Sequence, residues 1–175
     1  MKQGLCVALV LAAFGLLASA ADKAAPTQVE RGREVFLSSS KVTACATCHA
    51  MAGLGTAVAP DLTTMASFAP PRGFVATMRM SMTEKVLLVK TADGAFPAVL
   101  KQEQSDQSEF FDLGQTPPVL RKLTAKQIVS SERDQKWQHP PASVEYTSQE
   151  LADLVGFLKW AATGSQKEIK PSEVD

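Results

Sequence analysis

Three residues in the run Cys45-Ala46-Thr47-Cys48-His49 have types and a spacing that can do chemistry together. On one helical turn, two thiols three positions apart can each form a thioether with one vinyl group of the same porphyrin. The histidine directly after the second thiol then lies below the iron, where a neutral imidazole nitrogen is a proximal ligand. The C-x-x-C-H pattern therefore predicts one covalently attached c-type haem, held by Cys45, Cys48 and His49.

Two other kinds of site use the same residue types. A thioredoxin-like C-x-x-C lies between a strand and a helix of a βαβ unit, and no such pattern surrounds this motif. A structural zinc site needs four ligands, and the only other histidine is His139. Zinc would therefore require Cys45, Cys48, His49 and His139 together, and the adjacent Cys48 and His49 would strain to reach one tetrahedral ion. Haem is the favoured interpretation.

The first 20 residues are interpreted as a signal peptide. Lys2 forms a short positive n-region, residues 5–17 are apolar, and Ala18-Ser19-Ala20 is an A-x-A cleavage site. The apolar run is too short for a comfortable membrane span, and no stop-transfer pattern follows. An uncleaved N-terminal anchor is the alternative. Cleavage after Ala20 would leave 155 residues without an integral membrane span, and both remaining cysteines belong to the haem motif.

Charge and composition exclude some function classes for the expected mature chain. It carries 17 basic and 18 acidic side chains, a net charge of −1. No polybasic footprint is present, which argues against nucleic-acid binding. Gly53-Leu54-Gly55 begins like a dinucleotide fingerprint, but the third glycine is missing and no strand precedes it. The length suits one domain with an elaboration.

Helices are predicted in the first half of the mature chain. Thr27 can cap a helix that runs to about Leu37. Gly32 within it costs roughly 1 kcal/mol relative to alanine, and a close helix–helix crossing would justify that cost. Pro71 can begin another helix that runs to about Met80.

The C-terminal part of the chain carries a clear helix signal. Residues 147–150, Thr-Ser-Gln-Glu, form a capping box. The apolar residues that follow have helical spacing, and Gly164 ends the helix. Residues 165–175 have little apolar content and are predicted to be a disordered tail.

Residues 85–132 lack the helical spacing of the flanking segments and favour β structure. Strand candidates lie at residues 86–89, 95–101, 109–113, 119–123 and 128–129, and turn signals such as Asp93-Gly94 separate them. Short strands at such spacing predict a small antiparallel sheet or barrel.

The two ends of the chain together resemble a monohaem class I cytochrome c. The matching residues are Gly32, Phe36, the haem motif, Pro60-Asp61-Leu62 and the run Glu150-Leu151-Ala152-Asp153-Leu154-Val155-Gly156-Phe157-Leu158. The resemblance implies that the terminal helices cross, with Gly32 facing Leu154 and Phe157. It also implies that the Pro60 carbonyl orients His49.

The resemblance implies an α+β fold over residues 21–164, in which a cytochrome c helical core carries an inserted small antiparallel β sheet or barrel at about residues 85–132. It also implies periplasmic localisation, because covalent haem attachment to such motifs belongs to export compartments. The middle of the chain resembles a bacterial subgroup of haem-binding domains with a β insertion. These domains are often partners of, or fused to, periplasmic dehydrogenases.

The distal ligand departs from the pattern of that subgroup. In those relatives it is a methionine followed by proline, shortly before the last helix. Here that place reads Trp137-Gln138-His139-Pro140-Pro141. We predict His139 as the sixth iron ligand. Met78, Met80 or Met82 as the ligand, or an open site, are the alternatives.

The leading functional hypothesis is a periplasmic one-electron carrier. Iron that is coordinated on both faces has no open site, so enzymatic substrate chemistry is not expected. The expected partner is a redox protein such as a periplasmic dehydrogenase or oxidase. One alternative is a haem subunit whose β insertion docks to a dehydrogenase, although the insertion could instead shield a haem edge. The other is a ligand-binding or peroxidase-like haem protein, if the sixth site is open.

Overall fold

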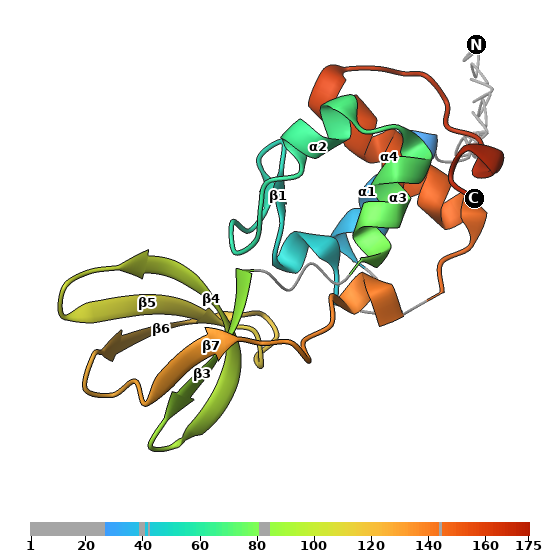
Figure 1. Ribbon diagram of the computed structural model, residues 1–175. Helices are drawn as coiled ribbons and strands as arrows, with labels where there is room; N and C mark the ends of the chain where they lie inside the picture. The colour runs from blue at the N-terminus through green and yellow to red at the C-terminus, as the bar shows by residue number, and fades with distance from the viewer. Residues whose placement is uncertain (1–26, 39–40, 42, 81–84, 144) are drawn as a thin grey trace, which may run out of the picture.

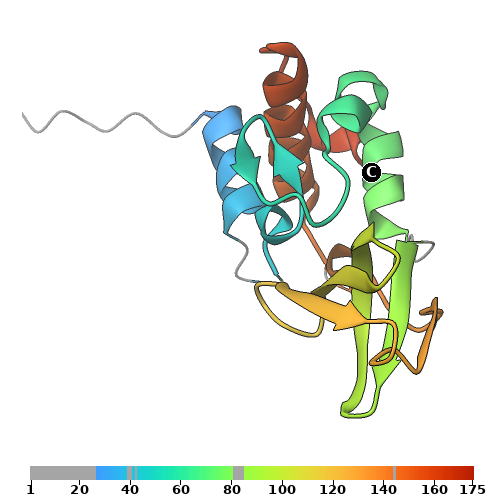
Figure 2. The ribbon, with the colours of Figure 1, turned by 90° about the vertical axis from the view of Figure 1, so that its left-hand side faces the viewer.

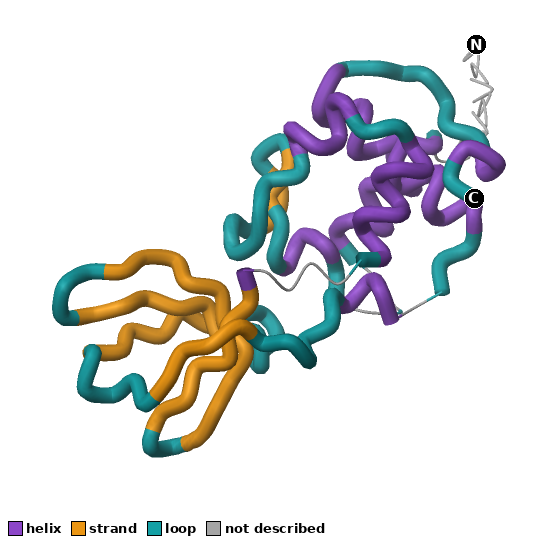
Figure 3. Tube along the Cα trace, in the orientation of Figure 1, coloured by secondary structure: helices purple, strands orange, loops and turns teal. Residues whose placement is uncertain are grey.

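The computed structural model describes residues 27–38, 41, 43–80, 85–143 and 145–175. The predicted signal peptide and Met82 lie outside the described residues. The helices gather in one part of the molecule and the long strands in the other (Figure 1). Figure 3 shows this separation by secondary structure. We call these the helical part and the sheet part.

The helical part is built around the two long terminal helices, α1 (Gln28–Leu37) and α4 (Ser148–Thr163). Thr27 and Thr147 cap them, and each threonine forms a complete capping box with the glutamate three residues later. Gly164 ends α4 with a φ of 73°, a left-handed conformation that favours glycine. The predicted positions of both helices are confirmed.

Helices α1 and α4 cross in direct contact at Gly32. A Cβ added to Gly32 would overlap with the main-chain carbonyl of Asp153 and would lie 2.8 Å from the Cβ of Phe157. The predicted crossing and the contact with Phe157 are confirmed, and the nearest group is the Asp153 carbonyl rather than Leu154. Beside it, Arg31 makes a bidentate ion pair with the buried Asp153 carboxylate at 2.8 and 2.9 Å.

Shorter elements complete the helical part. They are the 3₁₀ turn η1 (Cys45–Thr47), the hairpin β1 (Ala50–Met51) and β2 (Leu54–Gly55), α2 (Thr63–Phe68), α3 (Pro71–Arg79) and the 3₁₀ turn η3 (Pro140–Ser143). The helix that was predicted from Pro71 is confirmed. Helix α2 was not predicted, because six residues show too little periodicity.

The prediction that residues 165–175 form a disordered tail is wrong. Ile169 and Val174 are buried in the helical core, and the 3₁₀ turn η4 (Pro171–Glu173) lies between them. The Gln28 side chain on α1 bonds both the main-chain N–H and the carbonyl of Ile169, at 2.9 and 2.7 Å. Two apolar side chains and one glutamine therefore hold a segment whose composition is otherwise polar.

The sheet part is a five-stranded antiparallel sheet. Its strands are β3 (Val86–Thr91), β4 (Gly94–Glu103), β5 (Gln107–Asp112), β6 (Val119–Thr124) and β7 (Ser130–Arg133), in the order β6-β5-β4-β3-β7. Each strand lies at or next to a predicted one. Alternate side chains bury a cluster of Val89, Phe96, Ala98 and Phe110.

The predicted fold class, a cytochrome c helical core with a small inserted sheet or barrel, is wrong. Strands make up 26% of the structure and helices 36%, so the sheet is comparable in size to the helices. The physical reason is the second apolar cluster, which is separate from the core between the helices. Because it has its own core, the sheet forms a second body beside the helices (Figure 2).

Candidate functional site

A cavity of about 440 Å³ lies where the helical part meets the sheet part. Pockets of this size hold small molecules and cofactors. Both parts contribute lining side chains, most of them apolar, among them Phe36, Leu62, Phe74, Val86, Val99, Leu113, Leu154 and Leu158. We call it the central cavity. The C-x-x-C-H motif and His139 also line it.

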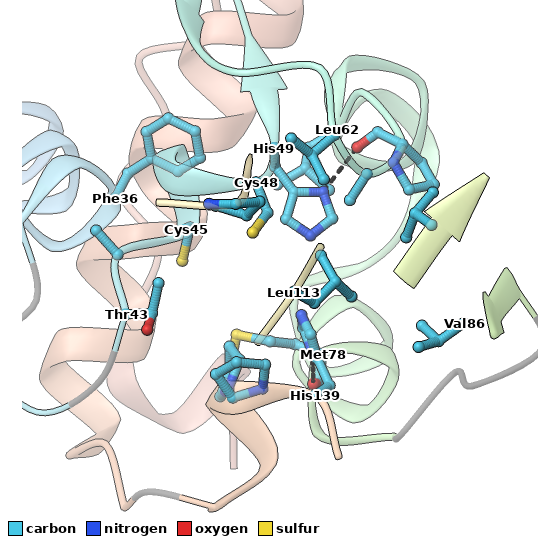
Figure 4. A pocket seen from close by; sticks show the side chains of 18 of the residues that line it. Phe36, Thr43, Cys45, Cys48, His49, Leu62, Met78, Val86, Leu113 and His139 are labelled. Carbon is cyan, nitrogen blue, oxygen red and sulfur yellow. Dashed lines mark hydrogen bonds between the residues drawn. The ribbon is translucent and has the colours of Figure 1, made fainter. Parts of the chain in front are cut away.

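The turn η1 places the C-x-x-C-H motif on the central cavity. The N–H groups of Cys48 and His49 both donate to the Cys45 carbonyl, at 3.1 and 2.8 Å. This tight turn brings both thiols and the His49 ring to the same cavity, as Figure 4 shows. Both cysteines are free. The expectation that one helical turn presents the motif is confirmed.

Gly55 packs the β1–β2 hairpin against the C-x-x-C-H motif. Its φ is 76°, and an added Cβ would overlap with the His49 carbonyl and lie 3.0 Å from the Ala46 carbonyl oxygen. The next residue, Thr56, donates its N–H to that Ala46 carbonyl at 3.0 Å. Of the two glycines that begin like a dinucleotide fingerprint, Gly55 therefore supports the C-x-x-C-H motif instead. Sequence reasoning missed this role, because the only signal was a glycine at an unknown φ.

The ring of His49 is oriented by a main-chain carbonyl. Its Nδ1 lies 2.7 Å from the Pro60 carbonyl oxygen. A carbonyl can only accept a hydrogen bond, so Nδ1 carries the proton, and in the neutral ring Nε2 is left with a lone pair. The predicted role of Pro60 is confirmed.

The ring of His139 is held in the same way from the other side. It lies in the segment between β7 and α4, and its Nδ1 is 3.0 Å from the Met78 carbonyl oxygen at the end of α3. By the same argument, Nδ1 donates and Nε2 of the neutral ring has a lone pair. Trp137 packs beside this ring, with the centroids 6.1 Å apart.

The two imidazoles face each other across the central cavity. Their centroids are 6.0 Å apart and their planes are inclined at 84°. Figure 4 shows the second nitrogen of each ring pointing toward the other ring. A metal bound at the usual distance of about 2 Å from both nitrogens would separate the ring centres by about 6 Å. The spacing therefore fits one metal ion between two imidazoles.

The protonation states suit this arrangement. Burial lowers the pKa of His49 below its ordinary value, and the nearby His139 lowers it further, although the bond to Pro60 opposes the shift.

Burial raises the pKa of Cys45 to about 11 and also raises that of Cys48. Reactive thiols of redox motifs need the opposite shift. These two thiols are therefore poor candidates for a thioredoxin-like function.

The zinc alternative does not fit the geometry. Among the described residues, no group of three or more His, Cys, Asp or Glu side chains could hold a metal ion. A haem iron receives four nitrogens from its porphyrin and needs only two ligands from the chain. His49 and His139 can supply those two, and Cys45 and Cys48 lie beside them. The residues of the central cavity therefore fit a covalently attached haem.

Two of the methionines that were alternative ligands, Met78 and Met80, also line the central cavity. Met78 is buried and lines the central cavity, and Met80 borders it but is 58% exposed. Met82 lies outside the described residues. Since both histidine rings already meet across the cavity, we find no geometric need for a methionine.

No family model matches this chain, and no curated protein matches it. In the part of the chain that the structure describes, no helix has both the length and the apolar character needed to cross a membrane.

Proposed function

We propose that this chain is an exported, periplasmic c-type cytochrome that carries single electrons. One haem is attached to Cys45 and Cys48, and its iron is coordinated by His49 and His139. The observation that supports this most strongly is the pair of facing imidazoles, 6.0 Å apart, with both tautomers fixed by main-chain carbonyls. When bound, the haem supplies an iron that alternates between the ferric and ferrous states.

The chain's own residues prepare the cavity for that group. The Pro60 and Met78 carbonyls fix the orientation of the two rings and make the free nitrogens more basic. The mostly apolar lining favours an apolar group over water in the space between the rings. A ligand on each face leaves no position for a substrate, so the arrangement favours electron transfer over catalysis at the iron.

The periplasmic location follows from the attachment chemistry, which belongs to export compartments. A carrier must exchange electrons with other proteins, and we propose a redox protein such as a dehydrogenase or oxidase as the partner. The haem would lie between the helical and sheet parts, so either part can contribute to the partner surface.

Covalent haem staining tests the proposal. The full chain should be produced together with a haem-attachment system and separated by denaturing electrophoresis. We expect a band with haem-peroxidase activity and one haem iron per chain. The double variant Cys45→Ala/Cys48→Ala, produced in the same way, should lose the stain. A colourless wild-type protein would overturn the proposal.

A further inference from the structure

The lysine that lines the central cavity lies on its sheet side. Of the described residues that line it, Lys85 is the only lysine or arginine, and none is an aspartate or glutamate. Lys85 directly precedes β3, and Gln115 and Thr116 lie in the connection between β5 and β6. All three residues are exposed. They therefore form a polar border that carries a positive charge, on a cavity whose lining is mostly apolar.

The helical side has hydrogen-bond donors but contributes no lysine or arginine among the described lining residues. Its Thr77 hydroxyl already donates to the Gly73 carbonyl at 2.9 Å. Thr43 lies beside Cys45, as Figure 4 shows. An anionic group in the central cavity would therefore find its charge partner on the sheet side.

The attachment chemistry fixes which edge of a haem would face that side. The two vinyl groups of a haem and its two propionates lie on opposite edges of the macrocycle. Figure 4 shows Cys45 and Cys48 on one side of the line between the two imidazoles, and Val86, the neighbour of Lys85, on the other. Thioethers to the two cysteines would therefore direct the propionates toward the sheet part.

We propose that Lys85, with Gln115 and Thr116 as neighbouring donors, forms the propionate-binding site of this haem. The inference rests on the proposed function. A carboxylate at the edge of an apolar cavity needs an opposite charge and hydrogen-bond donors to offset its lost hydration. Lys85 supplies the charge, and the amide and hydroxyl groups supply further donors. The sheet part then has a defined role, which is to complete the site that the helical part begins.

The midpoint potential of the covalent holoprotein tests the inference. Ferric haem carries one more positive charge than ferrous haem, so a nearby lysine favours the ferrous state. We expect Lys85→Gln to increase the ratio of oxidised to reduced haem at the wild-type midpoint by about threefold to tenfold. Lys85→Arg should preserve the wild-type ratio. Lys90→Gln is the matched control, because Lys90 is an exposed lysine of β3 that does not line the cavity.

A second measurement identifies the propionates as the partner of Lys85. The full chain with Cys45→Ala and Cys48→Ala would be titrated with ferric protoporphyrin IX and with its dimethyl ester, which lacks the two negative charges. We expect tighter binding of the free acid, and we expect Lys85→Gln, but not Lys90→Gln, to remove most of that preference. Equal affinities for acid and ester would overturn the inference.

The two proposals fail in different ways. A wild-type chain without covalent haem would overturn the proposed function. A normal covalent haem whose potential changes equally in Lys85→Gln and Lys90→Gln would overturn the propionate site and leave the proposed function intact.

Discussion

His139 is oriented by a main-chain carbonyl, not by another side chain. Its bond to the Met78 carbonyl depends on where α3 ends and on the path of the segment between β7 and α4. The Met78 side chain is not part of that bond. Truncating the histidine and altering the methionine should therefore have different consequences for the iron.

We expect His139→Ala to convert the haem iron from a low-spin, six-coordinate form to a high-spin form that accepts added ligands. Removal of the imidazole opens the sixth position, and added imidazole should restore the low-spin spectrum. Met78→Leu, the matched control on the same cavity, should stay low-spin. Visible spectra of the ferric proteins distinguish the high-spin form from the low-spin form in each variant. A low-spin, six-coordinate His139→Ala protein without added ligand, or a high-spin Met78→Leu protein, would contradict the assignment.

At the residue scale, side-chain chemistry was predictable and main-chain partners mostly were not. Two thiols and two imidazoles define the candidate site by their types, so the sequence sufficed to select Cys45, Cys48, His49 and His139. The bond from His139 to the Met78 carbonyl involves no particular side-chain type. Such contacts depend on the tertiary fold, so residue types alone could not reveal them.

At the scale of elements, the crossing of α1 and α4 depends on the missing side chain of Gly32. We expect Gly32→Ala to lower the free energy of unfolding by about 2–3 kcal/mol, because the methyl group overlaps with a main-chain carbonyl of α4. Alanine's helix preference of about 1 kcal/mol offsets only part of this. Chemical denaturation followed in the Soret band measures the change.

Gly73→Ala is the matched control for this effect, because Gly73 also lies within a helix. Its added Cβ would come 3.2 Å from the Pro70 side chain and would overlap with no main-chain atom. We expect its stability to stay within about 1 kcal/mol of the wild type. If Gly32→Ala and Gly73→Ala lowered the free energy of unfolding equally, the close contact of α1 with α4 would not explain the effect at Gly32.

The capping box of α4 should make stability depend on pH. The pKa of Glu150 is lowered, chiefly by its bond to Lys41 at 2.7 Å and then by the N–H of Thr147. Because the folded-state pKa lies below the unfolded value, this carboxylate stabilises the fold above about pH 4.5, and the contribution is lost as the pH falls through the folded-state pKa.

We therefore expect Glu150→Gln to be less stable than the wild type at pH 7, with a difference that shrinks steadily below about pH 4.5. Urea unfolding at a series of pH values measures this. Glu103→Gln, at an exposed position of β4, is the control and should show no such trend. If the stability difference between Glu150→Gln and the wild type stayed constant down to acid pH, ionisation of Glu150 would not be coupled to folding.

Local signals predicted most elements but not how they associate. Capping boxes, Gly164 and the turn at Asp93-Gly94 mark boundaries in a few residues, so helix and strand positions were predictable. The pairing of β3 with β7 joins residues at least 40 positions apart and leaves no local signal. The packing of Ile169 was missed for the same reason, because its partner Gln28 lies at the other end of the chain.

At the scale of the whole molecule, the sheet part is a second body with its own core, and it lines one side of the central cavity through Val86, Val99 and Leu113. The resemblance that was found in the sequence covers only the two ends of the chain. It therefore described the sheet as a small insertion and gave no information about its core. The size of that core depends on pairings between distant strands, which short strand signals do not specify.

We propose that the imidazoles of His49 and His139 coordinate one iron from opposite faces. Electron paramagnetic resonance of the ferric holoprotein, with its near-infrared absorption, tests this most directly. Ligand planes inclined at 84° leave two iron d orbitals nearly equal in energy, so we expect a low-spin signal with a single large g value and no methionine–iron charge-transfer band. A high-spin ferric signal, or a spectrum that contains the methionine–iron band, would overturn coordination by the two imidazoles.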